Sequence, residues 1–269
     1  MSPGYLADTA TGLPIPADAT FVSFDAERRH RKQRLAAALR VFGKYGFGEG
    51  ISGHISVRDP EFSNRFWVNP FGISFNRVRV ADLLCADEEG NVIAGRHKLN
   101  PSAFVIHSAI HRQYPHLDAA AHAHTINSRA LGAVGHLLEP VDQESTAFYQ
   151  RQALYTDYEG PSTGAEQGRD IADKFTNDEY GTHRAMLLKH HGVITVGESL
   201  EEAVHWFLTW DNCARVQLLA RAAGPHETFT AEQAGAAAQG FGDQQLARFS
   251  FNLLWDEITH DQPDLLDEE

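Results

Sequence analysis

The stretch from residue 185 to residue 222 constrains the fold most, because two apolar strands in it run into one long helix. AMLLKHH (185–191) and GVITVG (192–197) are predicted to be paired strands. A capping box at Ser199–Glu202 opens a helix over residues 200–222. An apolar stripe on this helix predicts that it covers a sheet. The stripe consists of Ala203, Val204, Trp206, Phe207, Trp210 and Cys213.

Strands and helices alternate along the rest of the chain. Glycine-bounded or alternating runs predict strands at 51–59, 66–70 and 119–124, and a hairpin that turns at Glu89–Gly90. Helical spacing and caps predict helices at 24–45, 102–113, 165–176 and 242–257, with further caps at Thr125 and Thr230. We therefore expect a single α/β domain over 24–256. We expect residues 1–23 to form an extended arm and residues 257–269 to form a loose acidic tail.

Composition and charge exclude several classes of function. No run of about 18 uncharged apolar residues predicts a membrane span, and the first twenty residues lack the pattern of a signal peptide. A formal charge of −13 argues against nucleic acid as a partner. Only two cysteines are present, Cys85 and Cys213, so a disulfide framework is not expected. We expect a cytoplasmic protein.

Histidine spacing gives the sharpest indication of chemistry. His122 and His124 are two residues apart on a predicted strand, so their imidazoles point to the same side. The alternative is two histidines at a strand end whose hydrogen bonds are satisfied without a metal. His190 and His191 end another strand before Gly192, and alternation lets one of them face inward. Three neutral imidazoles on one face would leave coordination positions open, as catalytic metal sites do.

These residues belong to a longer resemblance. GHISVR (53–58), VNPFGISF (68–75), KLNPSAFVIHSAIHRQYPHLDAAAHAH (98–124) and LLKHHGVITVGESLEEA (187–203) together resemble the class II aldolase/adducin family over about 28–225. The resemblance implies a three-layer α/β/α fold with a central, mainly antiparallel sheet. It also implies a homotetramer with active sites at subunit contacts. The metal ligands that it implies are His122, His124 and His191, and His190 would then be structural.

The sequence departs from the sugar-phosphate aldolases of this family. The resemblance aligns Ala103 with the glutamate that serves those enzymes as acid and base, and alanine cannot move a proton. His54, Phe71 and Pro101 stand where the resemblance expects asparagine, threonine and serine of the phosphate pocket. Phosphate binding needs donors and small residues, so we do not expect a sugar-phosphate aldolase.

Aromatic residues near the expected pocket favour a planar or phenolic substrate, although they could equally be core residues. Glu144 and Tyr149 are the candidate catalytic groups, since either could contact a substrate oxygen; a capping or solvent-exposed Glu144 is the alternative. The predicted pocket consists of His54, Trp67, Phe71, Phe75, Ser102, Phe104 and Phe148.

Three functions remain open. The first is a coenzyme-independent non-haem Fe(II) oxygenase that takes a small aromatic molecule and O2, similar to members of the family in aminocoumarin antibiotic pathways. The second is a Zn-type lyase or decarboxylase, in which the metal polarises a carbonyl. The third is a non-catalytic, adducin-like interaction domain, which would not need three ligand histidines. No organic cofactor is expected, and cobalt or manganese would also suit the ligands.

Overall fold

The computed structural model describes residue 15, residues 19–157 and residues 164–269, and it leaves out the side chains of residues 102 and 103. Most of the predicted arm, 1–23, therefore lies outside the described residues. The helices are α1 (Phe24–Lys44), α2 (Pro101–Gln113), α3 (Ile126–Val134), α4 (Ala165–Asp173), α5 (Leu200–Ala223), α6 (Ala231–Phe241) and α7 (Gln244–Asp261). The 3-10 helices are η1 (Phe75–Arg77), η2 (Val80–Asp82), η3 (Glu144–Phe148) and η4 (Pro263–Leu266).

An eight-stranded sheet with the order β4-β3-β2-β1-β5-β10-β9-β6 forms the centre of the molecule. Its paired neighbours are antiparallel except β6 and β9, which run parallel. The strands of this sheet are β1 (His54–Arg58), β2 (Arg65–Val68), β3 (Leu84–Asp87), β4 (Val92–Ala94), β5 (Ala119–Ala123), β6 (Gln152–Tyr155), β9 (Ala185–Leu188) and β10 (Gly192–Gly197); a separate hairpin pairs β7 (Thr176–Asn177) with β8 (Gly181–Thr182).

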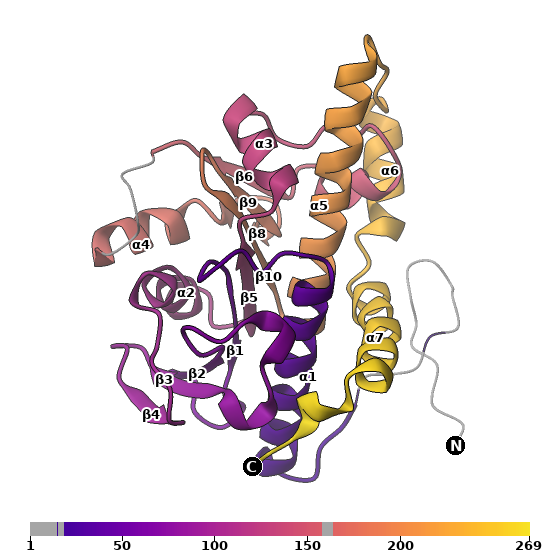
Figure 1. Ribbon diagram of the computed structural model, residues 1–269. Coiled ribbons are helices and arrows are strands. Elements are labelled where there is room, and N and C mark those ends of the chain that lie inside the picture. The colour runs from indigo at the N-terminus through magenta and orange to yellow at the C-terminus, as the bar shows by residue number, and fades with distance from the viewer. Residues whose placement is uncertain (1–14, 16–18, 158–163) are drawn as a thin grey trace.

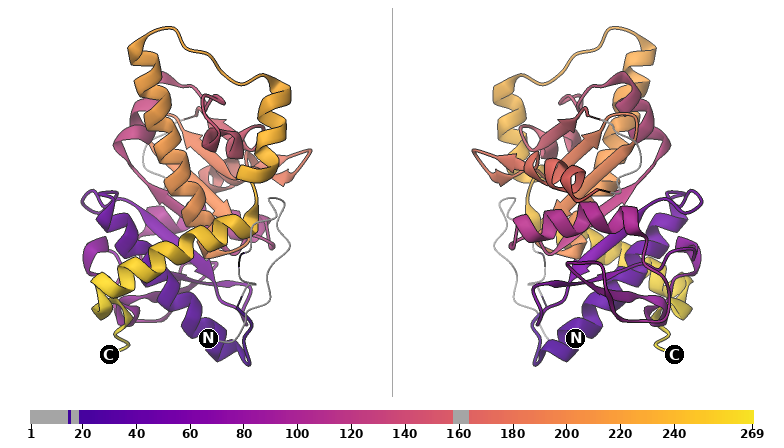
Figure 2. Two further views of the ribbon diagram at one scale, coloured as in Figure 1. Left: turned by 90° about the vertical axis from the view of Figure 1, so that its right-hand side faces the viewer. Right: turned by 90° about the vertical axis from the view of Figure 1, so that its left-hand side faces the viewer.

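Helices cover both faces of the sheet, which gives the expected three-layer α/β/α fold. In Figure 1, α2 and α4 lie on one side of the strands, and α1, α5 and α7 lie on the other. Figure 2 (left) shows α7 crossing beside α1 and α5. Alternate residues of β5 serve the two layers: Ala119, Ala121 and Ala123 pack with α1 and α5, whereas Ala120 packs with α2 and α4. Alanines in this central strand let both helical layers approach closely.

Local signals in the sequence place most element ends correctly. Ser199 caps α5, and its hydroxyl accepts a hydrogen bond from the backbone N–H of Glu202 at 3.2 Å. Thr230 and Gln233 form a capping box at the start of α6. Gly90 turns the β3–β4 hairpin with a φ of 87°, a conformation that glycine adopts without strain. No described helix combines the length and apolar character that a membrane crossing requires.

Two segments differ from the expectation. The predicted loose tail, 257–269, is instead held to the domain, because α7 runs to Asp261 and Leu265 is fully buried. Arg40 also pairs with Asp264 at 2.5 Å. The second difference is β6, a strand that the sequence analysis does not predict. It has one buried residue, Tyr155, and forms the edge of the sheet, so it carries little of the periodic pattern that predicts a strand.

Candidate metal centre

The structure brings the three predicted histidines together at one end of the sheet. His122 lies near the end of β5, His124 follows that strand, and His191 lies in the turn between β9 and β10. Because β10 pairs with β5 so that Val193 faces Ala123, this turn lies beside the end of β5. The ring centroids are 4.9 Å apart for His122 and His124, 4.9 Å for His122 and His191, and 4.6 Å for His124 and His191.

The tight β9–β10 turn depends on two unusual backbone positions. His190 has a φ of 61°, in the left-handed region that few non-glycine residues adopt. A Cβ on Gly192 would lie 2.7 Å from the carbonyl oxygen of Ala123 and within 3.3 Å of atoms of both His122 and His124. Glycine therefore lets the turn approach β5 closely enough for His191 to join the other two imidazoles.

Hydrogen bonds set the proton positions at the centre. His122 Nδ1 lies 2.9 Å from the carbonyl oxygen of Val193. A carbonyl only accepts, so this nitrogen carries the proton, and the Nε2 lone pair of His122 points toward His124. His124 Nε2 lies 3.0 Å from it. One ligand nitrogen from each of the three histidines lies within 4.8 Å of the others. This donor set fits a divalent metal ion, which prefers neutral imidazole nitrogens fixed by a second hydrogen bond.

Burial keeps these imidazoles neutral. It lowers the pKa of His122 well below its ordinary value and, with repulsion from His124, lowers the pKa of His191 to about 4. It also lowers the pKa of His124, and the nearby Arg129 guanidinium acts in the same direction. All three rings are therefore ready to bind a metal at neutral pH without first losing a proton.

Polar residues around the centre hold its elements in place. Thr125 caps α3 directly after His124, and its hydroxyl donates to the buried carboxylate of Asp211 on α5. Asn127 donates to the same carboxylate at 2.8 Å. At the rim, Arg129 pairs with Glu49 at 3.2 Å. The Thr125 cap was predicted, whereas the contacts with Asp211 and the Arg129–Glu49 pair were not, because they join segments that are far apart in the sequence.

Two small cavities lie next to the histidines. His54 and Phe104 line one, and Phe71 and Phe75 line the other, so four of the predicted pocket residues line cavities. The ring centroid of His54, which lines the first cavity, is 5.0 Å from that of His122. Asn69 and Asn100 line both cavities, which makes the two adjacent. Ser102 lies in the first turn of α2, but its side chain is outside the described residues.

Trp67 and Phe148 lie in the core and line neither cavity. The indole of Trp67 faces α1, and its Nε1 donates to Asp59, which follows β1, at 2.9 Å. Its neighbour Phe66 lines the first cavity instead. Successive residues on a strand face opposite sides, so the prediction was displaced by one residue. Phe148 is fully buried and packs edge-on against Trp206 of α5.

Glu144 and Tyr149 are not brought to the histidines within this chain. They lie at η3, which packs against α5 and α6, whereas His122 faces the α2 side of the sheet through its contact with His54. The next strand, β6, is the edge strand, separated from β5 by β10 and β9. Glu144 is exposed and accepts a hydrogen bond from Gln143 at 3.1 Å.

Sequence reasoning also missed a second group of histidines. His107 and His111 are four residues apart on α2, so their side chains leave the same face of the helix. Both contact the hydroxyl of Ser56 on β1. The i, i+4 spacing of two histidines on an apolar helix was the signal that could have identified them.

Known proteins are similar to this chain along most of its length. The model of the family described as Class II Aldolase and Adducin N-terminal domain matches residues 33–218. A 4-hydroxy-3-prenylphenylpyruvate oxygenase/4-hydroxy-3-prenylbenzoate synthase of Streptomyces roseochromogenus subsp. oscitans is 38% identical over 90% of this chain and 87% of its own length. Decarboxylase NovR of Streptomyces niveus is 37% identical over 90% of each chain.

A solved structure is also similar along nearly the whole chain. L-fuculose 1-phosphate aldolase from Glaciozyma antarctica PI12 has a TM-score of 0.85 and 36% identity, covering 93% of this chain and 97% of its own. Relatives that are named as an oxygenase and a decarboxylase, together with the three-histidine cluster, support a metal-dependent enzyme that acts on a small molecule. By sequence and by fold, the chain belongs to the class II aldolase and adducin family.

Proposed function

We propose that this protein is a coenzyme-independent, non-haem Fe(II) oxygenase that cleaves or decarboxylates a small phenolic substrate. The observation that carries the proposal is a cluster of three neutral histidines in which, among the described residues, no carboxylate joins the ligand set. Such a set leaves positions for both substrate and O2. The similarity to an oxygenase of a substituted 4-hydroxyphenylpyruvate supports the same reaction class.

His122, His124 and His191 would hold the metal, which when bound supplies the activation of O2. The protein contributes position and environment. The carbonyl of Val193 keeps the Nε2 lone pair of His122 directed at the cluster. Phe104, Phe71 and Phe75 give the adjacent cavities apolar walls, which suit an aromatic ring and exclude water. In our proposal the substrate ring lies against these residues.

A lyase or decarboxylase with zinc is the second candidate, and the likeness to the L-fuculose 1-phosphate aldolase favours it. Two features count against a sugar phosphate as its substrate. Ala103 offers no group that transfers a proton, and Phe71 and Pro101 stand where a phosphate pocket needs donors and small residues. A third candidate, an adducin-like interaction domain, gives no reason for the histidine cluster.

The test begins with protein purified under argon without added metal, followed by elemental analysis and oxygen uptake with 4-hydroxyphenylpyruvate. Iron at about one atom per chain and uptake coupled to release of CO2 is the expected result. Zinc with CO2 or aldehyde release in the absence of oxygen would favour the lyase. A chain that retains no metal would favour the interaction domain. His116→Ala, at an exposed position, is the control for histidine replacement.

The proposal also includes a homotetramer in the cytoplasm, without an organic cofactor and without nucleic acid or a membrane as partner. Sedimentation equilibrium of the metal-loaded protein tests the tetramer. An absorption spectrum of the purified protein tests for a bound organic cofactor.

A further inference from the structure

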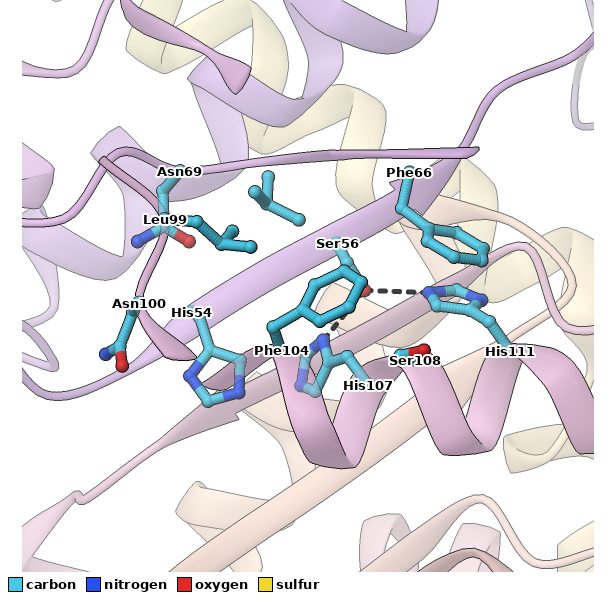
Figure 3. Close-up of a pocket in the computed structure, with 11 residues that line it drawn as sticks. His54, Ser56, Phe66, Asn69, Leu99, Asn100, Phe104, His107, Ser108 and His111 are labelled. Atoms are coloured by element: carbon cyan, nitrogen blue, oxygen red, sulfur yellow. Dashed lines mark hydrogen bonds between the residues drawn. The ribbon is translucent and has the colours of Figure 1, made fainter. Parts of the chain in front are cut away.

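Three buried polar side chains form a row between β1 and α2, next to the metal centre (Figure 3). The hydroxyl oxygen of Ser56 lies 2.7 Å from Nδ1 of His107 and 2.8 Å from Nε2 of His111. His111 Nδ1 lies 3.2 Å from the carbonyl oxygen of Leu117. All three side chains are at least nine-tenths buried, so no bulk water competes for these hydrogen bonds.

The carbonyl of Leu117 fixes the direction of the whole row. A carbonyl only accepts, so Nδ1 of His111 carries a proton and donates. Burial lowers the pKa of His111 to about 3, so the ring is neutral and its Nε2 accepts from the Ser56 hydroxyl. The Ser56 oxygen then accepts from Nδ1 of His107. A neutral His107 held in this tautomer keeps an unprotonated lone pair on Nε2.

His107, whose Nε2 carries that lone pair, lines a cavity. Nε2 of His107 and Nε2 of His54 are both buried without a hydrogen-bond partner among the described residues, and their ring centroids are 4.1 Å apart. The cavity that both residues line has a volume of about 20 Å³, enough for one water-sized group. An unpaired acceptor there costs about 1–3 kcal/mol, which a ligand that brings a donor would recover. Its apolar walls are Phe66, Val68, Leu99 and Phe104.

We propose that this cavity, the His107 cavity, is a subsite for an uncharged hydroxyl group of the substrate. The inference rests on the proposed function and names the group of the aromatic substrate that the protein recognises. A phenolic or alcoholic O–H donates to Nε2 of His107. A phosphate or carboxylate oxygen brings only lone pairs, which repel that of His107 in apolar surroundings. Burial keeps His107 neutral, with its pKa well below the ordinary value, so no positive charge offsets this repulsion.

The experiment compares two ligands that differ at one group. We would titrate 4-hydroxyphenylpyruvate and 4-methoxyphenylpyruvate into iron-loaded protein under argon, by calorimetry, so that no turnover occurs. The hydroxy compound should bind at least about tenfold more tightly, since the methyl ether has no donor for Nε2 of His107. In His107→Phe this preference should fall below about twofold.

Failure of the subsite and failure of the proposed function give different results. Equal binding of both compounds by the wild type, or a preference that persists in His107→Phe, would overturn the hydroxyl subsite and leave the oxygenase intact. Absence of binding by either compound would contradict both. Thr195→Val is the matched control, because it removes another buried hydroxyl of the sheet, one that donates to the carbonyl of Ala203 at 2.7 Å; the preference should survive it.

A second variant tests the direction of the row without removing His107. In His111→Phe the Ser56 hydroxyl loses its acceptor and is free to donate to Nδ1 of His107, which moves the His107 proton to Nε2. The cavity then presents a donor, from which the phenol oxygen and the ether oxygen can both accept, and the preference for the hydroxy compound should disappear. Phenylalanine keeps the stacking of residue 111 on Phe66, whose ring centroid is 4.4 Å away. An unchanged preference would contradict the assigned tautomer.

Discussion

Two groups of histidines lie on the same face of the sheet and differ in the direction of their lone pairs. In the metal centre, His122, His124 and His191 point at one another, with ring centroids 4.6–4.9 Å apart. In the row on α2, His107 and His111 instead share the hydroxyl of Ser56. Burial lowers the pKa of every one of these imidazoles, so a low pKa does not distinguish the groups.

The two groups are distinguished by the hydrogen bond at Nδ1, the ring nitrogen that does not carry the free lone pair. The carbonyl of Val193 directs the lone pair of His122 toward other imidazoles, which suits a metal. The carbonyl of Leu117, acting through Ser56, leaves the lone pair of His107 without a partner beside a cavity with apolar walls, which suits a hydroxyl group. His54 lies between the groups, since its ring contacts both His107 and His122. A buried neutral histidine can therefore suit a metal or a hydroxyl group, depending on which group accepts the hydrogen bond from its Nδ1.

The strongest test of this contrast replaces one histidine from each group. His122→Ala removes a ligand, and we expect metal affinity to fall by more than about 100-fold, because even outer partners of ligands contribute 10–100-fold. His107→Phe should retain the metal. Elemental analysis after dialysis against a weak chelator measures both variants. A His122→Ala protein that keeps wild-type metal content would show that the cluster is not the metal site.

A smaller effect is expected from Gly192→Ala, which leaves every ligand in place. The added methyl group would lie 2.7 Å from the carbonyl oxygen of Ala123, so the β9–β10 turn must move away from β5. We expect destabilisation of about 1–3 kcal/mol and about tenfold weaker metal binding, because His191 moves with the turn. Thermal unfolding and metal titration measure these effects. Gly235→Ala is the control, since a methyl group there meets no atom within 4 Å.

Acid titration tests the row on α2 by a different property. The pKa of His111 is about 3 in the folded protein and about 6.5 in the unfolded chain. Between these values the unfolded chain binds more protons, so the contribution of His111 to stability is complete above pH 6.5 and is lost as the pH falls. The loss approaches about 1.4 kcal/mol per pH unit. His111→Phe should therefore lose about 1 kcal/mol less than the wild type between pH 7 and pH 5.5 in urea unfolding. If the two proteins respond equally, His111 is not a buried neutral group. Thr195→Val, which removes no titratable group, should follow the wild type.

The sequence predicted what depends on short-range geometry. His122 and His124 share a face because strand residues alternate, and Ser199 and Thr230 cap helices through neighbours three residues away. The pocket was predicted less well. Both faces of β2 are covered by helices, so Phe66 and Trp67 are both buried and alternation alone does not say which one faces α2. That choice is made by packing between distant segments, which the sequence pattern does not record.

The smallest effect is expected on the opposite face of the sheet. Glu144 was a candidate catalytic group because it carries a carboxylate and follows the metal-ligand segment in the sequence. In the fold it is exposed at η3, beside α5 and α6, and the sheet lies between it and the His107 cavity. We expect Glu144→Gln and Tyr149→Phe to change kcat/KM by less than about twofold, within the range of surface substitutions. Steady-state oxygen uptake measures this. A loss of more than tenfold in both variants, with metal content unchanged, would show that η3 reaches an active site. Since η3 does not reach the histidine cluster of its own chain, that active site would belong to a second subunit. Mixing Glu144→Gln protein with His122→Ala protein should then restore activity in mixed oligomers.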